Sequence, residues 1–163
     1  MTTTSDAHAI RTDHIKHEAS VKSIGLLYYL ASLLSVIAAV GVFAGGELAV
    51  GARWAVGLLL LGLSFCYFKL GGWFRTLNPK GRTPGTILAC VGLLGVPVGT
   101  LVSVYILYLI QSKKGATVFS ADYKAVIEAT PEIKYKTSKI IVGLLIILGF
   151  FISLAIVGVF LGK

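Results

Sequence analysis

The chain has 163 residues, of which 56% are hydrophobic and 13% charged, and its mean hydropathy is +0.86. Soluble domains carry roughly 25% charged residues, so this chain has too little polar material to cover a globule in water. Its net charge of +8 lies outside the apolar runs, as in membrane proteins beside anionic lipid headgroups, and no nucleic-acid recognition motif accompanies it. We therefore expect a lipid bilayer as its partner and no nucleic acid.

Four apolar runs are each long enough to cross a hydrocarbon layer of about 30 Å, which takes roughly 20 helical residues. They are residues 24–43, 54–74, 87–110 and 140–161. The expected fold is therefore all-α: an integral membrane four-helix bundle over residues 24–163, preceded by a polar N-terminal tail, residues 1–23.

The N-terminal tail contains the stretch "DHIKHE", in which His14 and His17 stand three residues apart, with His8 upstream. Histidines at this spacing can share a metal on a helix, but a zinc site needs three or four converging ligands and nothing in the tail fixes them. The favoured interpretation is a disordered, solvated tail. No metal or other cofactor is expected, although metal binding by these histidines stays an open alternative.

Small residues gather on one face of each expected span, where close approach of backbones helps helices to pack in lipid. In span one they are Gly25, Ser32, Ser35 and Ala39, and in span two Gly57, Ser64 and Gly71. In span three they are Gly85, Gly92, Gly95, Gly99 and Ser103. Span four carries them on two faces, Gly149 with Ser153 and Gly158 with Gly162. These faces predict packing within one bundle, with a dimer seam as the alternative.

Pro97 lies inside span three, where it removes one backbone hydrogen bond and frees the carbonyl of Leu93. The hydroxyl of Thr100 is placed to help satisfy the backbone there. The sequence therefore predicts a kink at Pro97. A bend that improves packing is favoured over a ligand pocket.

The turn over residues 69–85, "KLGGWFRTLNPKGRTPG", combines basic residues with Trp73 and Phe74, as at a membrane rim. Four spans would put both termini and this turn on one side, and the connections 44–53 and 112–139 on the other. Basic residues then nearly balance between the two sides. Because the turn is short, basic and free of acidic residues, we favour both termini in the cytoplasm.

Residues 112–139, "SKKGATVFSADYKAVIEATPEIKYKTSK", form a charged segment between two apolar runs. Ser120 is a good N-cap for a helix over residues 121–129, and Thr130-Pro131 supplies its stop. Tyr123, Val126 and Ile127 share one side of that helix. We expect a short amphipathic helix lying along the headgroup layer between spans three and four. Its candidate interfacial or partner-docking residues are Phe119, Tyr123, Val126, Ile127 and Tyr135.

Two stretches, "GVPVGTLVSVYILYLIQSKKG" and "VFSADYKAVIEATPEIKYKTS", resemble a loosely defined group of small bacterial multi-pass membrane proteins. The resemblance covers residues 69–138. It implies a bacterial inner membrane and brings no catalytic residues.

No catalytic set of residues stands out, because the carboxylates of the charged segment have neither a histidine nor a cysteine beside them. The expected function is a non-catalytic structural or accessory subunit of a membrane assembly. This interpretation rests on glycine packing faces and on spans without mid-membrane Asp, Glu, His or Arg. The alternative is a small carrier or channel that uses the kinked third helix and works as a homo-oligomer. Its candidate pathway residues are Thr100, Ser103, Tyr105 and Tyr108.

Overall fold

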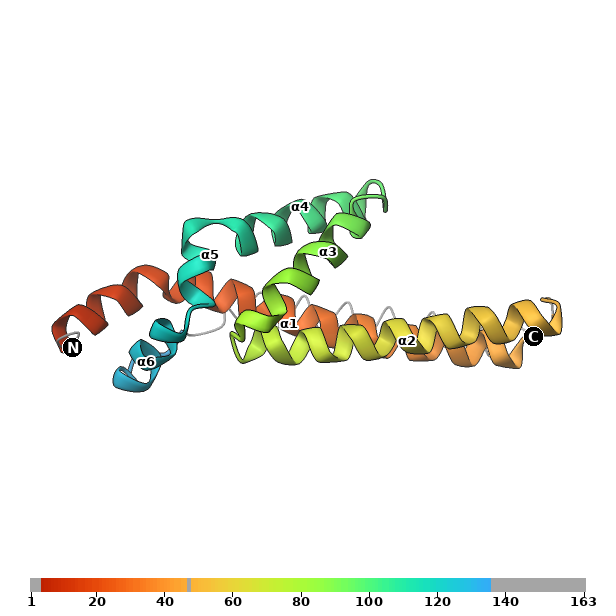
Figure 1. Cartoon of the computed structure of the whole chain (residues 1–163), viewed down its shortest axis with the longest axis horizontal. Helices are drawn as coiled ribbons and strands as arrows, with labels where there is room; N and C mark the ends of the chain where they lie inside the picture. The colour runs from red at the N-terminus through yellow and green to blue at the C-terminus, as the bar shows by residue number, and fades with distance from the viewer. Residues whose placement is uncertain (1–3, 47, 136–163) are drawn as a thin grey trace. The chain divides into compact units, whose positions relative to one another are not determined.

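The structure is a computed structural model that describes residues 4–46 and 48–135. These residues are all-helical, with no strand among them, which confirms the expected class for this part of the chain. Figure 1 shows the helices α1 Thr4–Ala44, α2 Val50–Arg75, α3 Arg82–Gly92, α4 Val98–Gln111, α5 Lys113–Val118 and α6 Ala121–Ala129, with the 3-10 turn η1 Pro79–Gly81 before α3. The chain divides into two units, Met1–Ile133 and Lys134–Lys163, and of the second the structure describes Lys134 and Tyr135.

α1 and α2 form an antiparallel pair whose contact surface is built from small residues (Figure 1). A Cβ atom placed on Gly25 would lie 2.9 Å from the carbonyl oxygen of Gly71, and one placed on Gly71 would lie 2.9 Å from that of Gly25. One heptad along each helix, the Ser64 hydroxyl donates to the carbonyl oxygen of Ser32 at 3.0 Å. The packing faces expected for spans one and two are therefore confirmed.

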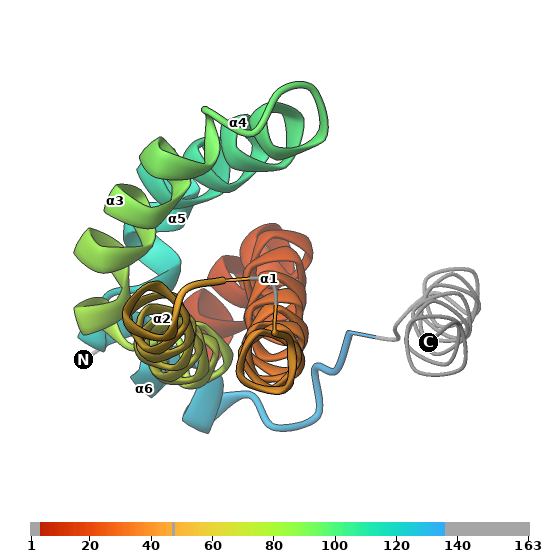
Figure 2. The same ribbon diagram turned by 90° about the vertical axis from the view of Figure 1, so that its right-hand side faces the viewer.

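The prediction of a single helix over residues 87–110 is wrong, because two helices occupy this stretch. α3 ends at Gly92, the chain reverses through residues 93–97, and α4 begins at Val98 with Pro97 as its N-cap residue. Figure 2, which looks along α1 and α2, shows α3 and α4 running together to one side of that pair. Pro97 therefore marks the tip of a helical hairpin and not a kink within one helix.

The N-terminal tail is helical and packed, so the expected disordered tail is wrong for residues 4–23. α1 begins at Thr4 and runs without a break to Ala44. Ala7, Arg11, Glu18 and Val21 in its first half are buried. The polar tail and the first apolar run are one continuous helix.

The charged segment forms two helices, each with a serine N-cap. The Ser120 side chain accepts from the backbone N–H of Tyr123 at 3.1 Å, and α6 ends at Ala129 before Thr130, as predicted. α5 was not expected; its N-cap Ser112 accepts from the N–H of Gly115 at 3.0 Å. Both helices pack on the first half of α1. The expectation that this segment and the N-terminal residues lie at opposite ends of a bundle is therefore wrong.

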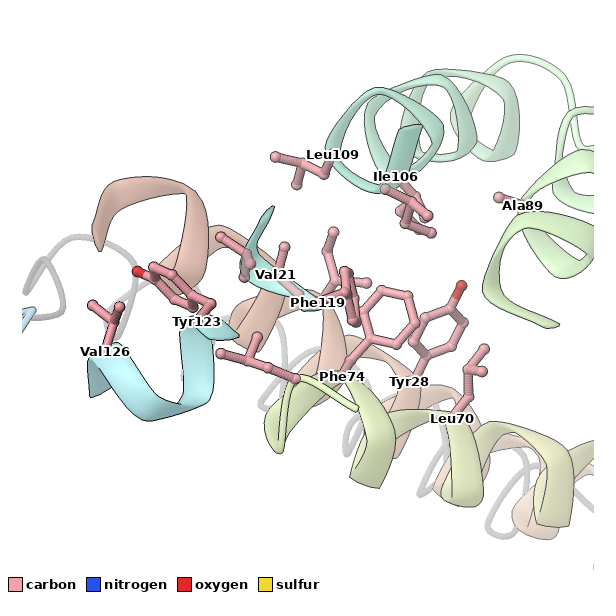
Figure 3. Packing of buried hydrophobic residues seen from close by; sticks show 14 of the residues in the cluster. Val21, Tyr28, Leu70, Phe74, Ala89, Ile106, Leu109, Phe119, Tyr123 and Val126 are labelled. Carbon is pink, nitrogen blue, oxygen red and sulfur yellow. The ribbon is translucent and has the colours of Figure 1, made fainter. Parts of the chain in front are cut away.

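The hydrophobic core is built from side chains of α1 to α6 (Figure 3). Phe74 stands at its centre, with ring centroids 5.3 Å from Tyr28 and 5.4 Å from Phe119. The core also contains Val21, Leu70, Ala89, Ile106, Leu109, Ile110, Val118, Tyr123 and Val126. This packing holds α5 and α6 against α1 and α2.

Two helices in the described part of the chain are long and apolar enough to cross a membrane, judged by length and composition. They are Asp6–Ala44 within α1 and Val50–Arg75, which is α2. The fourth expected span, residues 140–161, lies outside the described residues, and so do Gly158 and Gly162.

Candidate functional site: a buried ionic cluster

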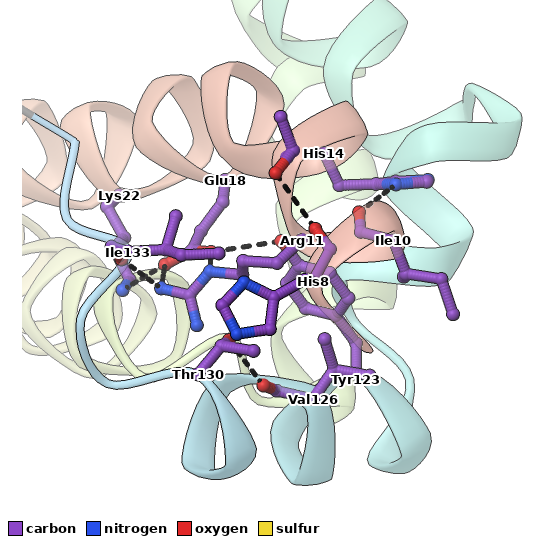
Figure 4. Close-up of polar contacts among 11 residues, drawn as sticks. His8, Ile10, Arg11, His14, Glu18, Lys22, Tyr123, Val126, Thr130 and Ile133 are labelled. Carbon is purple, nitrogen blue, oxygen red and sulfur yellow. Dashed lines mark hydrogen bonds and ion pairs between the residues drawn. The ribbon is translucent and has the colours of Figure 1, made fainter. Parts of the chain in front are cut away.

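Arg11 and Glu18 form a buried ion pair on one face of α1 (Figure 4). The Nε of Arg11 lies 3.1 Å from Oε2 of Glu18, and its Nη2 donates to Oε1 at 3.3 Å. Arg11 is 6% exposed and Glu18 3%. Burying two charges costs free energy unless each is compensated by further contacts, so the neighbours of this pair decide its stability.

Glu18 is compensated from two further directions. Lys22, one turn along α1, donates to Oε1 at 2.6 Å, and the hydroxyl of Tyr123 in α6 donates to Oε2 at 3.0 Å. Burial, and then the adjacent Glu18 carboxylate, raises the pKa of the Tyr123 phenol above its ordinary value of 10.0. At neutral pH Tyr123 is therefore a neutral hydrogen-bond donor to a carboxylate.

Arg11 is less completely satisfied than Glu18. Its Nη2 also donates to the carbonyl oxygen of Ile133 at 3.5 Å. Its Nε makes the ion pair without hydrogen-bond geometry, and its buried Nη1 has no hydrogen-bond partner among the described residues. Removal of Glu18 would therefore leave an almost unpaired buried cation.

Weaker polar contacts surround the cluster and join the same parts of the chain. His8 Nε2 lies 2.9 Å from Oε1 of Glu132, and Lys114 donates to Oδ1 of Asp13 at 2.8 Å. The hydrogen bond and charge of Lys114 lower the pKa of Asp13, whose side chain is 60% exposed. Exposed pairs of this kind add little to stability.

The histidines of α1 are bound to separate partners. His14 Nδ1 lies 2.9 Å from the carbonyl oxygen of Ile10, and His17 Nε2 lies 2.9 Å from that of Leu109 in α4. Within residues 4–46 and 48–135, no group of three or more His, Cys, Asp or Glu side chains is placed to hold a metal ion. The cluster's groups instead connect α1 to α4, α5 and α6.

The predicted docking face of the charged segment points into the protein. Phe119, Tyr123 and Val126 are buried, and Ile127 is half-buried against the same core, because the apolar side of α6 packs on α1. The three buried residues are therefore not exposed to serve as the interfacial or docking residues that the sequence predicts. Tyr135 remains exposed.

The predicted packing residues of span three lie at the tip of the α3–α4 hairpin. A Cβ atom on Gly99 would lie 2.8 Å from the carbonyl oxygen of Gly92, and one on Gly92 would overlap the side chain of Ser103. Gly95 adjoins the Cα of Gly99 at the turn itself. The glycines therefore allow close approach within the hairpin.

The Thr100 hydroxyl donates to the carbonyl oxygen of Leu93 at 2.7 Å. This hydrogen bond confirms the expectation that Thr100 satisfies the carbonyl that Pro97 leaves free.

Arg11 and Glu18 were not predicted as site residues, yet the sequence carries a signal for them. The small residues on the packing face of α1 belong to a series of positions that alternates in steps of four and three residues. The series continues into the polar tail and is typical of a helix that packs along one face. It runs through Ala7, Arg11, His14, Glu18, Val21, Gly25, Tyr28 and Ser32. Polar residues on such a face indicate a buried ionic contact.

No protein-family model, curated protein or solved structure matches this chain.

Proposed function

We propose that this chain is an integral membrane protein and acts as a non-catalytic structural or accessory subunit of a membrane assembly. In this proposal α1 and α2 cross the plasma membrane of a bacterium, as the sequence resemblance implies. The N-terminus lies in the cytoplasm.

The observation that carries the membrane part is the exposed apolar surface of α1 and α2. Leu33, Leu58, Leu59, Phe65 and Phe68 are each more than half exposed. Such a side chain forgoes most of the about 1.5–3 kcal/mol that full burial contributes in water, and the surface repeats along both helices. In a bilayer these side chains contact lipid acyl tails, which are equally apolar, so their exposure carries no such loss.

The structural contacts made by polar groups in the ionic cluster and at the hairpin tip support the non-catalytic part. Within the described residues, both oxygens of Glu18 are occupied by Arg11, Lys22 and Tyr123. In the hairpin, Thr100 is bonded to the carbonyl of Leu93, and Ser103 packs against Gly92. Two of the candidate pathway residues for a carrier are therefore engaged in holding the α3–α4 turn.

The test is extraction in mild detergent followed by native mass determination. We expect the chain to resist release by alkaline carbonate and to co-purify with a defined set of other subunits. A homo-oligomer that conducts a solute in proteoliposomes would replace the accessory function with that of a carrier or channel. Recovery of folded chain from the soluble fraction without detergent would overturn the membrane part.

A further inference from the structure

We infer that residues 82–111 form a re-entrant hairpin, which enters and leaves the membrane through one face, and that the basic rim of this face contacts anionic lipid headgroups. The basic rim consists of Lys69, Arg75, Lys80, Arg82 and Lys113. The inference rests on the proposed membrane location and adds to it a topology and a lipid partner.

Neither helix of the hairpin is long enough to cross. α4 has 14 residues and α3 has 11, which correspond to about 21 Å and about 16 Å against a hydrocarbon layer of about 30 Å. A continuous helix over residues 87–110 would separate its ends by about 35 Å. The turn at residues 93–97 brings the chain back before it reaches the far side.

Direct contacts hold the two ends of the hairpin together. The Nε of Arg82, at the start of α3, donates to the carbonyl oxygen of Ile110, near the end of α4, at 3.2 Å. The side-chain amide of Gln111 donates to the hydroxyl of Thr86 at 2.9 Å. Residues joined in this way cannot lie on opposite faces of a bilayer.

Part of the backbone at the tip of the hairpin is paired within the hairpin, and backbone at membrane depth needs pairing of this kind. The N–H groups of Leu93, Leu94 and Gly95 donate to carbonyls of the last turn of α3, and that of Gly99 donates to Gly95. Thr100 pairs with the carbonyl of Leu93. The side chains that surround the tip are apolar, and Leu94 is 84% exposed.

The basic residues lie at the base of the hairpin. The base adjoins the first half of α1 and the charged segment, which meet in the Lys114–Asp13 contact. Of the basic residues between Thr4 and Ile133, only Arg53 lies at the far end of α1 and α2, where it donates to the carbonyl of Gly45. The others are Arg11, Lys16, Lys22, Lys114, Lys124 and the basic rim. This asymmetry predicts that the base faces the cytoplasm.

The basic rim has no acidic neighbours in its own stretch of sequence. No Asp or Glu occurs from residue 48 to residue 121, and the Asp13 carboxylate binds Lys114 instead. Trp73 and Phe74 precede Lys80, and Trp73 is only half-buried. Cations beside an aromatic side chain at this depth suit the anionic headgroups of the cytoplasmic leaflet.

Single-cysteine accessibility tests the topology. In a Cys66→Ser/Cys90→Ser background, one cysteine is introduced as Lys80→Cys, Lys113→Cys, Leu48→Cys or Leu94→Cys, at exposed positions. Intact spheroplasts and inverted vesicles of a bacterial host are treated with an impermeant maleimide. We expect Lys80→Cys and Lys113→Cys to react only in inverted vesicles, Leu48→Cys only in spheroplasts, and Leu94→Cys in neither.

Each other labelling pattern has a distinct meaning. Reaction of Lys80→Cys and Lys113→Cys from opposite sides would overturn the re-entrant hairpin while leaving the membrane location intact. Reaction of the pair only in spheroplasts would keep the hairpin and overturn its cytoplasmic orientation. Reaction of all four variants in a soluble fraction would overturn the proposed membrane location, and the inference with it.

The lipid partner is tested with the two tryptophans of the chain, Trp73 beside the basic rim and Trp54 at the far end. Trp54→Phe and Trp73→Phe each leave one reporter. In nanodiscs containing a minor fraction of brominated phosphatidylglycerol, we expect about fivefold stronger quenching of Trp73 than of Trp54, roughly the enrichment from one basic residue near an anionic surface. Brominated phosphatidylcholine is expected to quench both alike.

Neutralisation of three residues of the basic rim tests its part in lipid binding, and neutralisation of two basic residues outside the rim is the control. Arg75→Gln with Lys80→Gln and Lys113→Gln is expected to remove the preference of Trp73 for the anionic quencher, whereas Lys16→Gln with Lys124→Gln is expected to retain it. Equal quenching of both tryptophans by the anionic lipid in the unaltered chain would overturn the lipid partner.

Discussion

The hydroxyl of Tyr123 donates to Oε2 of Glu18 at 3.0 Å and so joins α6 to the first half of α1. Both side chains are buried. A phenol and a carboxylate in this position hold the charged segment on the N-terminal residues through one directional contact. Its strength depends on which of the two groups is ionised.

We expect the protein to lose stability at alkaline pH through Tyr123. The folded state raises the pKa of this phenol above its ordinary value of 10.0, so the folded chain retains a proton that the unfolded chain has released. The contribution of Tyr123 to the free energy of unfolding is full below pH about 10. It declines as the pH rises through the raised pKa of Tyr123. Proteolysis of residues 112–133 as a function of pH measures it.

Tyr123→Phe is the control for this pH dependence. It removes the group that titrates, at a cost of about 1–3 kcal/mol for the lost donor to a buried carboxylate. The alkaline decline should then flatten, whereas Tyr135→Phe, at an exposed tyrosine, should leave it unchanged. An identical decline in Tyr123→Phe would contradict the assignment.

Glu18→Gln should destabilise the protein by about 3–5 kcal/mol, because the change leaves Arg11 buried without a counter-charge. Thermal unfolding in detergent measures the loss. The matched control is Asp13→Asn, which removes a pair with 60% and 48% exposed side chains and should have little effect. Similar losses in both variants would show that burial does not set the strength of these pairs.

Gly71→Ala should weaken the pairing of α1 and α2. Its Cβ would lie 2.9 Å from the backbone oxygen of Gly25, which cannot move without separating the helices, and such overpacking costs about 1–3 kcal/mol. Gly62→Ala, in the same helix, meets nothing within 4 Å and should be neutral or slightly stabilising. Fluorescence energy transfer between labels on α1 and α2 measures how readily the two helices separate in each variant. Equal effects of the two substitutions would contradict the close contact of Gly71 with Gly25.

Thr100→Val should loosen the tip of the α3–α4 hairpin, because the isosteric change leaves the carbonyl of Leu93 without its 2.7 Å hydrogen bond. Side-chain hydrogen bonds in membrane proteins contribute about 0.6 kcal/mol on average and up to about 1.7. Hydrogen exchange at the backbone N–H groups of residues 93–95 is expected to accelerate accordingly. Thr117→Val, which removes a hydrogen bond to the carbonyl of Lys113 at the base, should leave the tip unchanged.

Local signals predicted much of what the structure contains. Ser120 and Thr130-Pro131 fixed the bounds of α6, because caps and proline act over a few residues. The small-residue faces of 24–43 and 54–74 predicted the contact surface of α1 and α2. The hydrogen bond from Thr100 to the Leu93 carbonyl followed from the positions of Pro97 and Thr100 in the sequence.

The chain reversal at residues 93–97 could not be predicted in the same way. An apolar run with a glycine face is compatible with a straight span and with a hairpin, and Pro97 bends either. The contact that distinguishes them, Arg82 to Ile110, joins residues 28 positions apart. The prediction of a disordered N-terminal tail failed for a related reason. The burial of Arg11 and Glu18 depends on α6, which lies more than 100 residues later in the sequence.

The unbroken course of α1 from Thr4 to Ala44 links two contact surfaces by angle. Arg11 and Glu18 face α6, and Gly25 and Ser32 face α2, and both orientations are set by one helical phase. One residue inserted after Ser23 would rotate the second surface by about 100° relative to the first. Seven would nearly restore the angle while displacing the surfaces by about 10 Å. The backbone length between Glu18 and Gly25 is therefore itself a determinant of how the helices assemble.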